Sequence, residues 1–161
     1  MTTEKINHRI FLAESHEHFT AAQLIIASYV DFLGMDLAFQ NFAYEMDNFC
    51  AMYGPPLGSM ILLEVDCSIV GAVGLRYFSD GICEMKRMYI VPQCQGMGLG
   101  KHLISFFIER ARALQYKAIR LDTVPRLDKA LTLYRKYGFY PIAAYRYNPD
   151  PDAIFLELKI M

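Results

Sequence analysis

The 161-residue sequence lacks a strong net charge, a long hydrophobic run and a secretory signal. Its formal charge of −1 argues against nucleic acid as a partner, because nucleic-acid-binding proteins normally present a basic face. The longest apolar runs, such as 60–65, are far shorter than the roughly 20 residues of a membrane-spanning helix. The N-terminus shows no charged segment followed by an apolar block. We therefore expect a cytoplasmic protein with no nucleic-acid or membrane partner.

Clustered metal ligands are also missing. The four cysteines, at positions 50, 67, 83 and 94, form no CxxC pair, and the four histidines form no i, i+4 pair. This spacing fits neither a zinc site nor a dense disulfide framework. We expect reduced thiols and no bound metal.

The composition is that of a packed globular protein. Hydrophobic residues make up 54% of the sequence and charged residues 20%, which argues against disorder. The sequence shows no internal repeats or long linkers. Its length fits one domain with its own core, so residues 1–161 are expected to form a single domain.

Hydrophobic periodicity divides the chain into two halves. In the first half, strands are expected at 9–14, 60–65, 69–77 and 83–90, and helices at 19–33 and 37–52. In the second half, a long helix carries an apolar stripe from Leu103 to Leu114 and is followed by a strand at 118–123. A helix that ends at Gly138 and strands at 139–145 and 154–159 complete the chain. The pattern predicts an α/β (α+β) fold with a mixed sheet, in which strands 83–90 and 118–123 are parallel.

A glycine-rich loop lies where the strand at 83–90 gives way to the long helix. It reads Gln95-Gly96-Met97-Gly98-Leu99-Gly100-Lys101. Glycine allows close approach of a ligand to the backbone, and the free amides of a helix's first turn attract anions. Lys101 adds a positive charge at the same place. The segment therefore predicts a phosphate-binding loop.

Two common phosphate motifs do not fit this loop. A P-loop requires glycine five residues before the Gly-Lys pair and Ser or Thr after it, but Gln95 and His102 hold those positions. A dinucleotide-binding fingerprint requires a third small residue where the chain has Lys101 or Leu103.

Two motifs resemble the GCN5-related N-acetyltransferase (GNAT) superfamily. Gln95-x-x-Gly98-x-Gly100 is similar to its pyrophosphate-binding loop, and 130–139 is similar to its last helix and exit, A-x-x-L-Y-x-x-x-G-F. The resemblance is strong over 82–140 and fair from 60 to 157. It implies a mostly antiparallel twisted sheet, flanked by helices, whose central parallel strands splay apart to hold coenzyme A.

The resemblance also implies a set of cofactor contacts. Acetyl-CoA would be the co-substrate, with its pantetheine arm and acetyl carbonyl on the backbone of Met88, Tyr89 and Ile90. The loop would hold the pyrophosphate, through Gln95, Gly96, Met97, Gly98, Leu99, Gly100 and Lys101. The acceptor would be an amine of a small molecule or peptide. One departure is Leu127, where many members carry Asn.

Acetyl transfer needs a neutral amine and a proton for the departing thiolate. A lysine-like amine is neutral in only on the order of one molecule in a thousand at pH 7, so a carboxylate base is useful. Asp122 and Glu84 are both candidates for this base, and for each the alternative is a solvated or ion-paired strand residue. A water-mediated transfer or the absence of a dedicated base is the third possibility. Tyr134 is the candidate general acid, and its alternative is a core aromatic.

Two questions stay open from the sequence. Aromatic and Met residues in the N-terminal third, such as Phe32, Met35, Phe39 and Tyr53, are candidates for an acceptor wall or for the core. A non-catalytic acyl-CoA-binding domain is the alternative function, although it would need neither Tyr134 nor the two acids. Both a monomer and a homodimer are compatible with the sequence.

Overall fold

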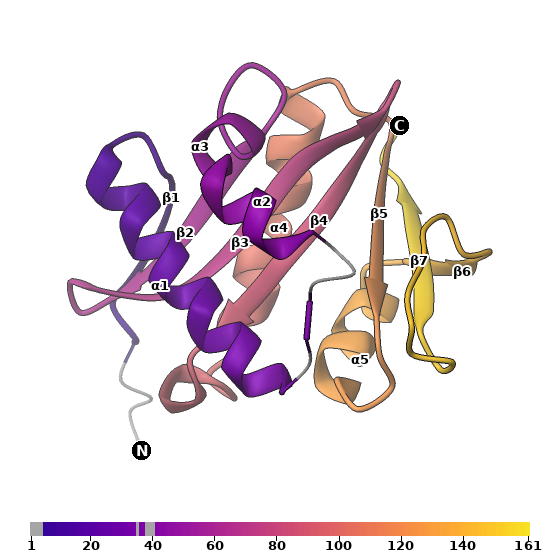
Figure 1. Cartoon of the computed structure of the whole chain (residues 1–161). Coiled ribbons are helices and arrows are strands. Elements are labelled where there is room, and N and C mark those ends of the chain that lie inside the picture. Colours follow the sequence, from indigo (N-terminus) through magenta and orange to yellow (C-terminus); the bar gives the residue numbers. More distant parts are fainter. Residues whose placement is uncertain (1–4, 35, 38–40) are drawn as a thin grey trace.

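A single sheet with helices on both faces organises the chain (Figure 1). The computed structural model describes residues 5–34, 36–37 and 41–161. The strands are β1 (His8–Leu12), β2 (Ser59–Val65), β3 (Ser68–Ser79), β4 (Ile82–Ile90), β5 (Ala118–Thr123), β6 (Tyr140–Ile142) and β7 (Ile154–Lys159). The helices are α1 (His16–Leu33), α2 (Phe42–Asp47), α3 (Phe49–Met52), α4 (Leu99–Ala113) and α5 (Asp128–Lys136), with a 3-10 turn at Pro92–Cys94.

The seven strands follow the order β1-β2-β3-β4-β5-β7-β6. All neighbouring strands are antiparallel except β4 and β5, which are parallel and are connected by α4. The expected mixed sheet with one central parallel pair is therefore confirmed.

Strand β2 shows why both faces of the sheet are covered. Its side chains alternate between the faces, and Met60 to Leu63 are all buried. Ile61 and Leu63 belong to one core with α4 and α5, and Met60 and Leu62 to another core with α1 and α3. Among the helices of the described ranges, none is long and apolar enough to cross a membrane.

Two expected elements differ from the structure. The helix expected at 37–52 includes residues 38–40, which lie outside the described residues, and its described part is two short helices that meet at Asn48. The Asn48 side chain donates to the Tyr44 carbonyl at 2.9 Å, which helps to end α2 there. The strand expected at 139–145 is shortened to Tyr140–Ile142, because the chain then leaves the sheet and brings Tyr145 to β4.

Candidate active site

The parallel strands β4 and β5 pair only at their beginnings. Their register runs from Ile82 opposite Ala118 to Glu84 opposite Arg120 and then stops. Figure 1 shows the two strands diverging toward their C-terminal ends. The parting leaves the second half of β4 without a strand neighbour on that side, which opens the sheet at its centre.

A bulge in β4 accompanies the parting. Gly74 of β3 lies opposite Lys86, and Ala72 lies opposite Tyr89. Between these two pairs β4 has two residues and β3 has only one. Arg87, inside the bulge, has a left-handed φ of +60°, which is uncommon for a residue other than glycine. Its guanidinium donates two hydrogen bonds to Glu45 of α2, both at 3.1 Å, and both side chains are buried. This ion pair holds the bulge in place.

A cleft of about 680 Å³ lies where β4 and β5 part. Its walls come from β4, the glycine-rich loop, the start of α4, the end of β5 and α5. The predicted cofactor residues that line it are Met88, Tyr89, Ile90, Gln95, Gly96, Gly98, Leu99, Gly100 and Lys101. Met97 does not line it, and the residue is 47% exposed. The volume suits an extended cofactor or substrate of ordinary size.

The glycines of the loop have different structural roles. Gly96 and Gly98 have left-handed φ angles of +78° and +76°, and Gly98 is the N-cap residue of α4. At Gly100 a Cβ would lie only 3.1 Å from Leu133, so glycine there permits the close approach of α4 and α5. The Gln95 side chain donates to the Ile90 carbonyl at 2.7 Å and ties the loop to the end of β4. The first turn of α4, whose amides have no partner within the helix, thus lines the cleft.

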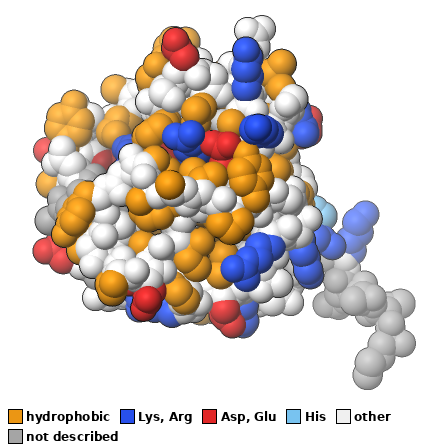
Figure 2. Space-filling model, turned by 90° about the vertical axis from the view of Figure 1, so that its right-hand side faces the viewer, with side chains coloured by type: hydrophobic (Ala, Val, Ile, Leu, Met, Phe, Trp, Pro, Cys, Tyr) orange, Lys and Arg blue, Asp and Glu red, His pale blue; other side chains and the backbone are white. Residues whose placement is uncertain are grey.

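The rim of the cleft is mainly basic. Lys101, Arg126, Lys129 and Lys136 line it, against the carboxylates of Asp122 and Asp128. On the face shown in Figure 2, basic side chains lie among hydrophobic ones. Together with the positive end of the α4 dipole, these cations favour an anionic ligand.

Tyr134 of α5 reaches the cleft from the face of the sheet that α4 also covers. Its ring is buried, and its hydroxyl donates to the Met88 sulfur on β4 at 3.7 Å. Burial raises the pKa of Tyr134 well above its usual range, so the phenol keeps its proton at neutral pH. The side chain can therefore donate a hydrogen bond into the cleft.

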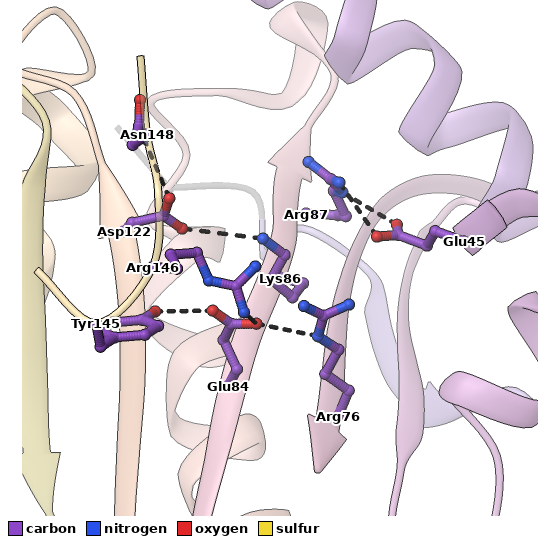
Figure 3. Close-up of polar contacts among 9 residues, drawn as sticks. All are labelled: Glu45, Arg76, Glu84, Lys86, Arg87, Asp122, Tyr145, Arg146 and Asn148. Atoms are coloured by element: carbon purple, nitrogen blue, oxygen red, sulfur yellow. Dashed lines mark hydrogen bonds and ion pairs between the residues drawn. The ribbon is translucent and has the colours of Figure 1, made fainter. Parts of the chain in front are cut away.

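Glu84 and Asp122, the two candidate bases, lie in different surroundings (Figure 3). Glu84 does not line the cleft, and its fully buried carboxylate has three donors: Arg76 at 3.0 Å, Arg146 at 2.8 Å and the Tyr145 hydroxyl at 2.8 Å. These donors match the ion-paired interpretation of Glu84.

Asp122 lines the cleft with a side chain that is 5% exposed. Its Oδ2 accepts a hydrogen bond from Asn148 at 3.2 Å, and its Oδ1 lies 3.9 Å from the Lys86 ammonium. Burial lowers the pKa of Lys86 to about 8, so this side chain is still mostly protonated at pH 7.

The expected acceptor wall is only partly found in the described residues. Phe32 lines the cleft with its ring 5.6 Å from that of Tyr89, whereas Tyr53 is fully buried in the core. Met35 and Phe39 lie outside the described residues. Leu127 lines the cleft and gives it an apolar surface at that position.

Comparisons with known proteins agree with this geometry. The model of the acetyltransferase (GNAT) family matches residues 23–139. An uncharacterized N-acetyltransferase of Schizosaccharomyces pombe is 34% identical over 140 residues, which cover 86% of each chain. A GNAT-family acetyltransferase of Staphylococcus aureus superposes with a TM-score of 0.79 at 18% identity, covering 96% of this chain and 100% of that one. YncA of Salmonella typhimurium, solved with its cofactor acetyl-CoA, superposes with a TM-score of 0.67 at 18% identity, covering 96% and 94%. The resemblance seen in the two sequence motifs is thereby confirmed, and the chain is an N-acetyltransferase that belongs to the GNAT family.

Proposed function

We propose that the chain transfers the acetyl group of acetyl-CoA to an amine of a small molecule or peptide, in the cleft between β4 and β5. The observation that carries this proposal is that the glycine-rich loop, a mainly basic rim, Asp122 and Tyr134 all line one cleft. The glycine-rich loop and the basic rim suit the phosphates of the cofactor, and Asp122 and Tyr134 line the same cleft. The acetyl-CoA described for YncA supports the same cofactor for this fold.

The proposed cofactor path follows β4. The pyrophosphate lies on the amides of Gly96 to Lys101, and the pantetheine arm extends along Met88 to Ile90, where β4 has no β5 partner. Backbone groups on this open edge are available for the arm and for the acetyl carbonyl. Gln95 contributes by fixing the loop to Ile90.

The proposed chemistry is a direct transfer. Asp122 accepts a proton from the amine, directly or through water, and the neutral nitrogen attacks the thioester carbonyl carbon. The carbon–sulfur bond then breaks, and Tyr134 donates a proton or a hydrogen bond to the departing thiolate. We propose Asp122 rather than Glu84 as the base, because Glu84 already accepts from three donors and lies away from the cleft. A non-catalytic acyl-CoA-binding protein would need neither Asp122 nor Tyr134 in the cleft, so this alternative is less well supported.

A matched pair of glycine substitutions tests the proposal. Gly98 and Gly81 have nearly equal φ angles, +76° and +75°, and a Cβ at each would lie beside a lysine side chain, 3.7 Å from Lys101 and 3.6 Å from Lys117. Aspartate tolerates this backbone conformation better than most residues. Gly98→Asp should keep the fold but weaken acetyl-CoA binding by about 100-fold, because it places a carboxylate at the phosphate site and removes charge-assisted hydrogen bonds.

Gly81→Asp, in the turn between β3 and β4, is the control and should bind acetyl-CoA like the wild type. Affinity is measured by titration calorimetry, and activity by release of free thiol from acetyl-CoA with a panel of amines. Wild-type affinity in a folded Gly98→Asp variant would refute the loop assignment. Failure of every amine to release thiol from bound acetyl-CoA would favour the non-catalytic alternative.

A further inference from the structure

A small inner pocket opens beside the cleft near Asp122. Its volume is about 50 Å³, enough for a few water molecules or one small polar group. Tyr29, Met85, Arg87, Asp122, Thr123 and Leu127 line both the pocket and the cleft. Lys86 and Asn148 line the inner pocket but not the cleft. An acceptor that places its amine at Asp122 would therefore extend a neighbouring group toward Lys86.

The charges of the cluster that adjoins this pocket do not balance, and of its members Lys86, Arg87 and Asp122 line the pocket itself. In the cluster of Figure 3, Arg76, Lys86, Arg87 and Arg146 contribute four positive charges, and Glu45, Glu84 and Asp122 contribute three negative ones. Glu45 neutralises Arg87, while the single carboxylate of Glu84 contacts both Arg76 and Arg146. The described residues of the cluster therefore carry one excess positive charge.

The excess charge constrains the acceptor. Charges in so dry a region are costly unless they are paired, and the side chains of Lys86, Arg87 and Asp122 are at most 5% exposed. The acetyl thioester is uncharged, and a simple alkylammonium at Asp122 would add a positive charge beside Lys86 and Arg87. An acceptor whose ammonium is accompanied by a carboxylate would instead add no net charge.

We propose that the acceptor is an amine with a carboxylate close to its amino group, as in an α-amino acid. This rests on the proposed function. The amino group lies at Asp122 and the carboxylate at Lys86, in the inner pocket. The Lys86 ammonium and the Asp122 Oδ1 are 3.9 Å apart, which is longer than a hydrogen bond. They therefore form a pair of opposite charges whose separation is similar to that between the two charged groups of an amino acid. Asn148 orients Asp122 from the other side by donating to Oδ2.

Matched substrates test this acceptor class. Leucine, phenylalanine and alanine are each compared with the decarboxylated amine and with the α-carboxamide of the same side chain. The carboxamide has a less basic amino group, so it would react faster if the enzyme ignored the carboxylate. The wild type should instead show a kcat/KM for at least one free amino acid that is about 10-fold or more above both analogues.

Two variants test whether the preference for a carboxylate depends on Lys86. Lys86→Met keeps the length of the side chain and removes its charge, so it should lower kcat/KM for the amino acid by about 10–100-fold, the worth of a charge-assisted hydrogen bond. The loss for the decarboxylated amine, which has no carboxylate to place at Lys86, should be about 10-fold or more smaller than the loss for the amino acid. Arg9→Met removes an exposed cation of β1 and is the control, with no change for any substrate.

Binding is measured separately, by calorimetric titration of the coenzyme A-saturated protein with each compound. If an amino acid binds more tightly than its two analogues, and this preference depends on Lys86, but the amino acid is not acetylated, the acceptor class is supported and the proposed catalysis is refuted. Turnover of amines with no preference for a carboxylate, or equal losses for acid and amine in Lys86→Met, would overturn the acceptor class and leave the proposed function intact. Neither binding nor turnover of any of the amino acids would also overturn it.

Discussion

Replacement of Asp122 by Asn should lower kcat by about 10²–10⁴-fold at pH 7, the usual contribution of a positioned base. The loss should shrink as the pH rises, because the fraction of neutral amine grows about tenfold per pH unit until the amine pKa is reached. The measurement is kcat against pH at saturating acceptor. Saturation matters because Lys86, with a pKa of about 8, loses its charge over the same range and could weaken acceptor binding.

Glu84→Gln is the comparator for this experiment. It weakens the contacts of Arg76, Arg146 and Tyr145, so it should lower the free energy of unfolding, and its residual activity should show no recovery at high pH. The opposite pattern, with recovery at high pH in Glu84→Gln and none in Asp122→Asn, would make Glu84 the base. Wild-type activity of both variants at every pH would exclude both carboxylates.

Tyr134→Phe should lower kcat by about 10²–10⁴-fold while acetyl-CoA affinity hardly changes. The phenylalanine ring can still pack against Phe139, at a centroid distance of 5.7 Å, but it cannot donate to the departing sulfur. The experiment needs an acceptor for which the chemical step limits turnover, because slow product release would hide the effect.

Tyr137→Phe is the matched control for Tyr134. Its hydroxyl lies on the same helix end and donates to the Lys101 carbonyl at 2.7 Å, outside the cleft lining. Its kcat should stay within a few-fold of the wild type. A Tyr134→Phe variant that loses only thermal stability would support the core-aromatic alternative. A variant whose KM rises while kcat is unchanged would indicate a role in binding.

Local patterns in the sequence predicted much of the fold. The periodicity change after residue 90 identified the parallel pair β4 and β5, and the loop at 95–101 appears where a strand meets a helix N-terminus. These features depend on neighbouring residues, so a single sequence carries them. The length of β6 was overestimated, since a short apolar run does not show whether the chain stays in the sheet beyond Ile142.

The surroundings of the site were harder to predict, because they depend on residues far apart in the chain. Glu84 is contacted by Tyr145 and Arg146, about sixty positions away, and Asn148 reaches Asp122 from the same segment. The bulge at Arg87 is held by Glu45 from α2. Lys86 lies two positions after Glu84 in the sequence, but nothing in its spacing shows that it lines a pocket beside Asp122.

The most direct test of the central claim, that acetyl-CoA binds between the splayed strands, is thermal unfolding in the presence of competing nucleotide ligands. At about 100 times its dissociation constant, a ligand specific to the folded state stabilises it by about 2.7 kcal/mol, or roughly 5–10 °C for a domain of this size. Acetyl-CoA and coenzyme A should produce such a shift in the wild type and in Gly81→Asp, and a much smaller one in Gly98→Asp. ATP and NAD at equal concentration should stabilise the protein less. Greater stabilisation by ATP or NAD, or none by acetyl-CoA, would contradict the account.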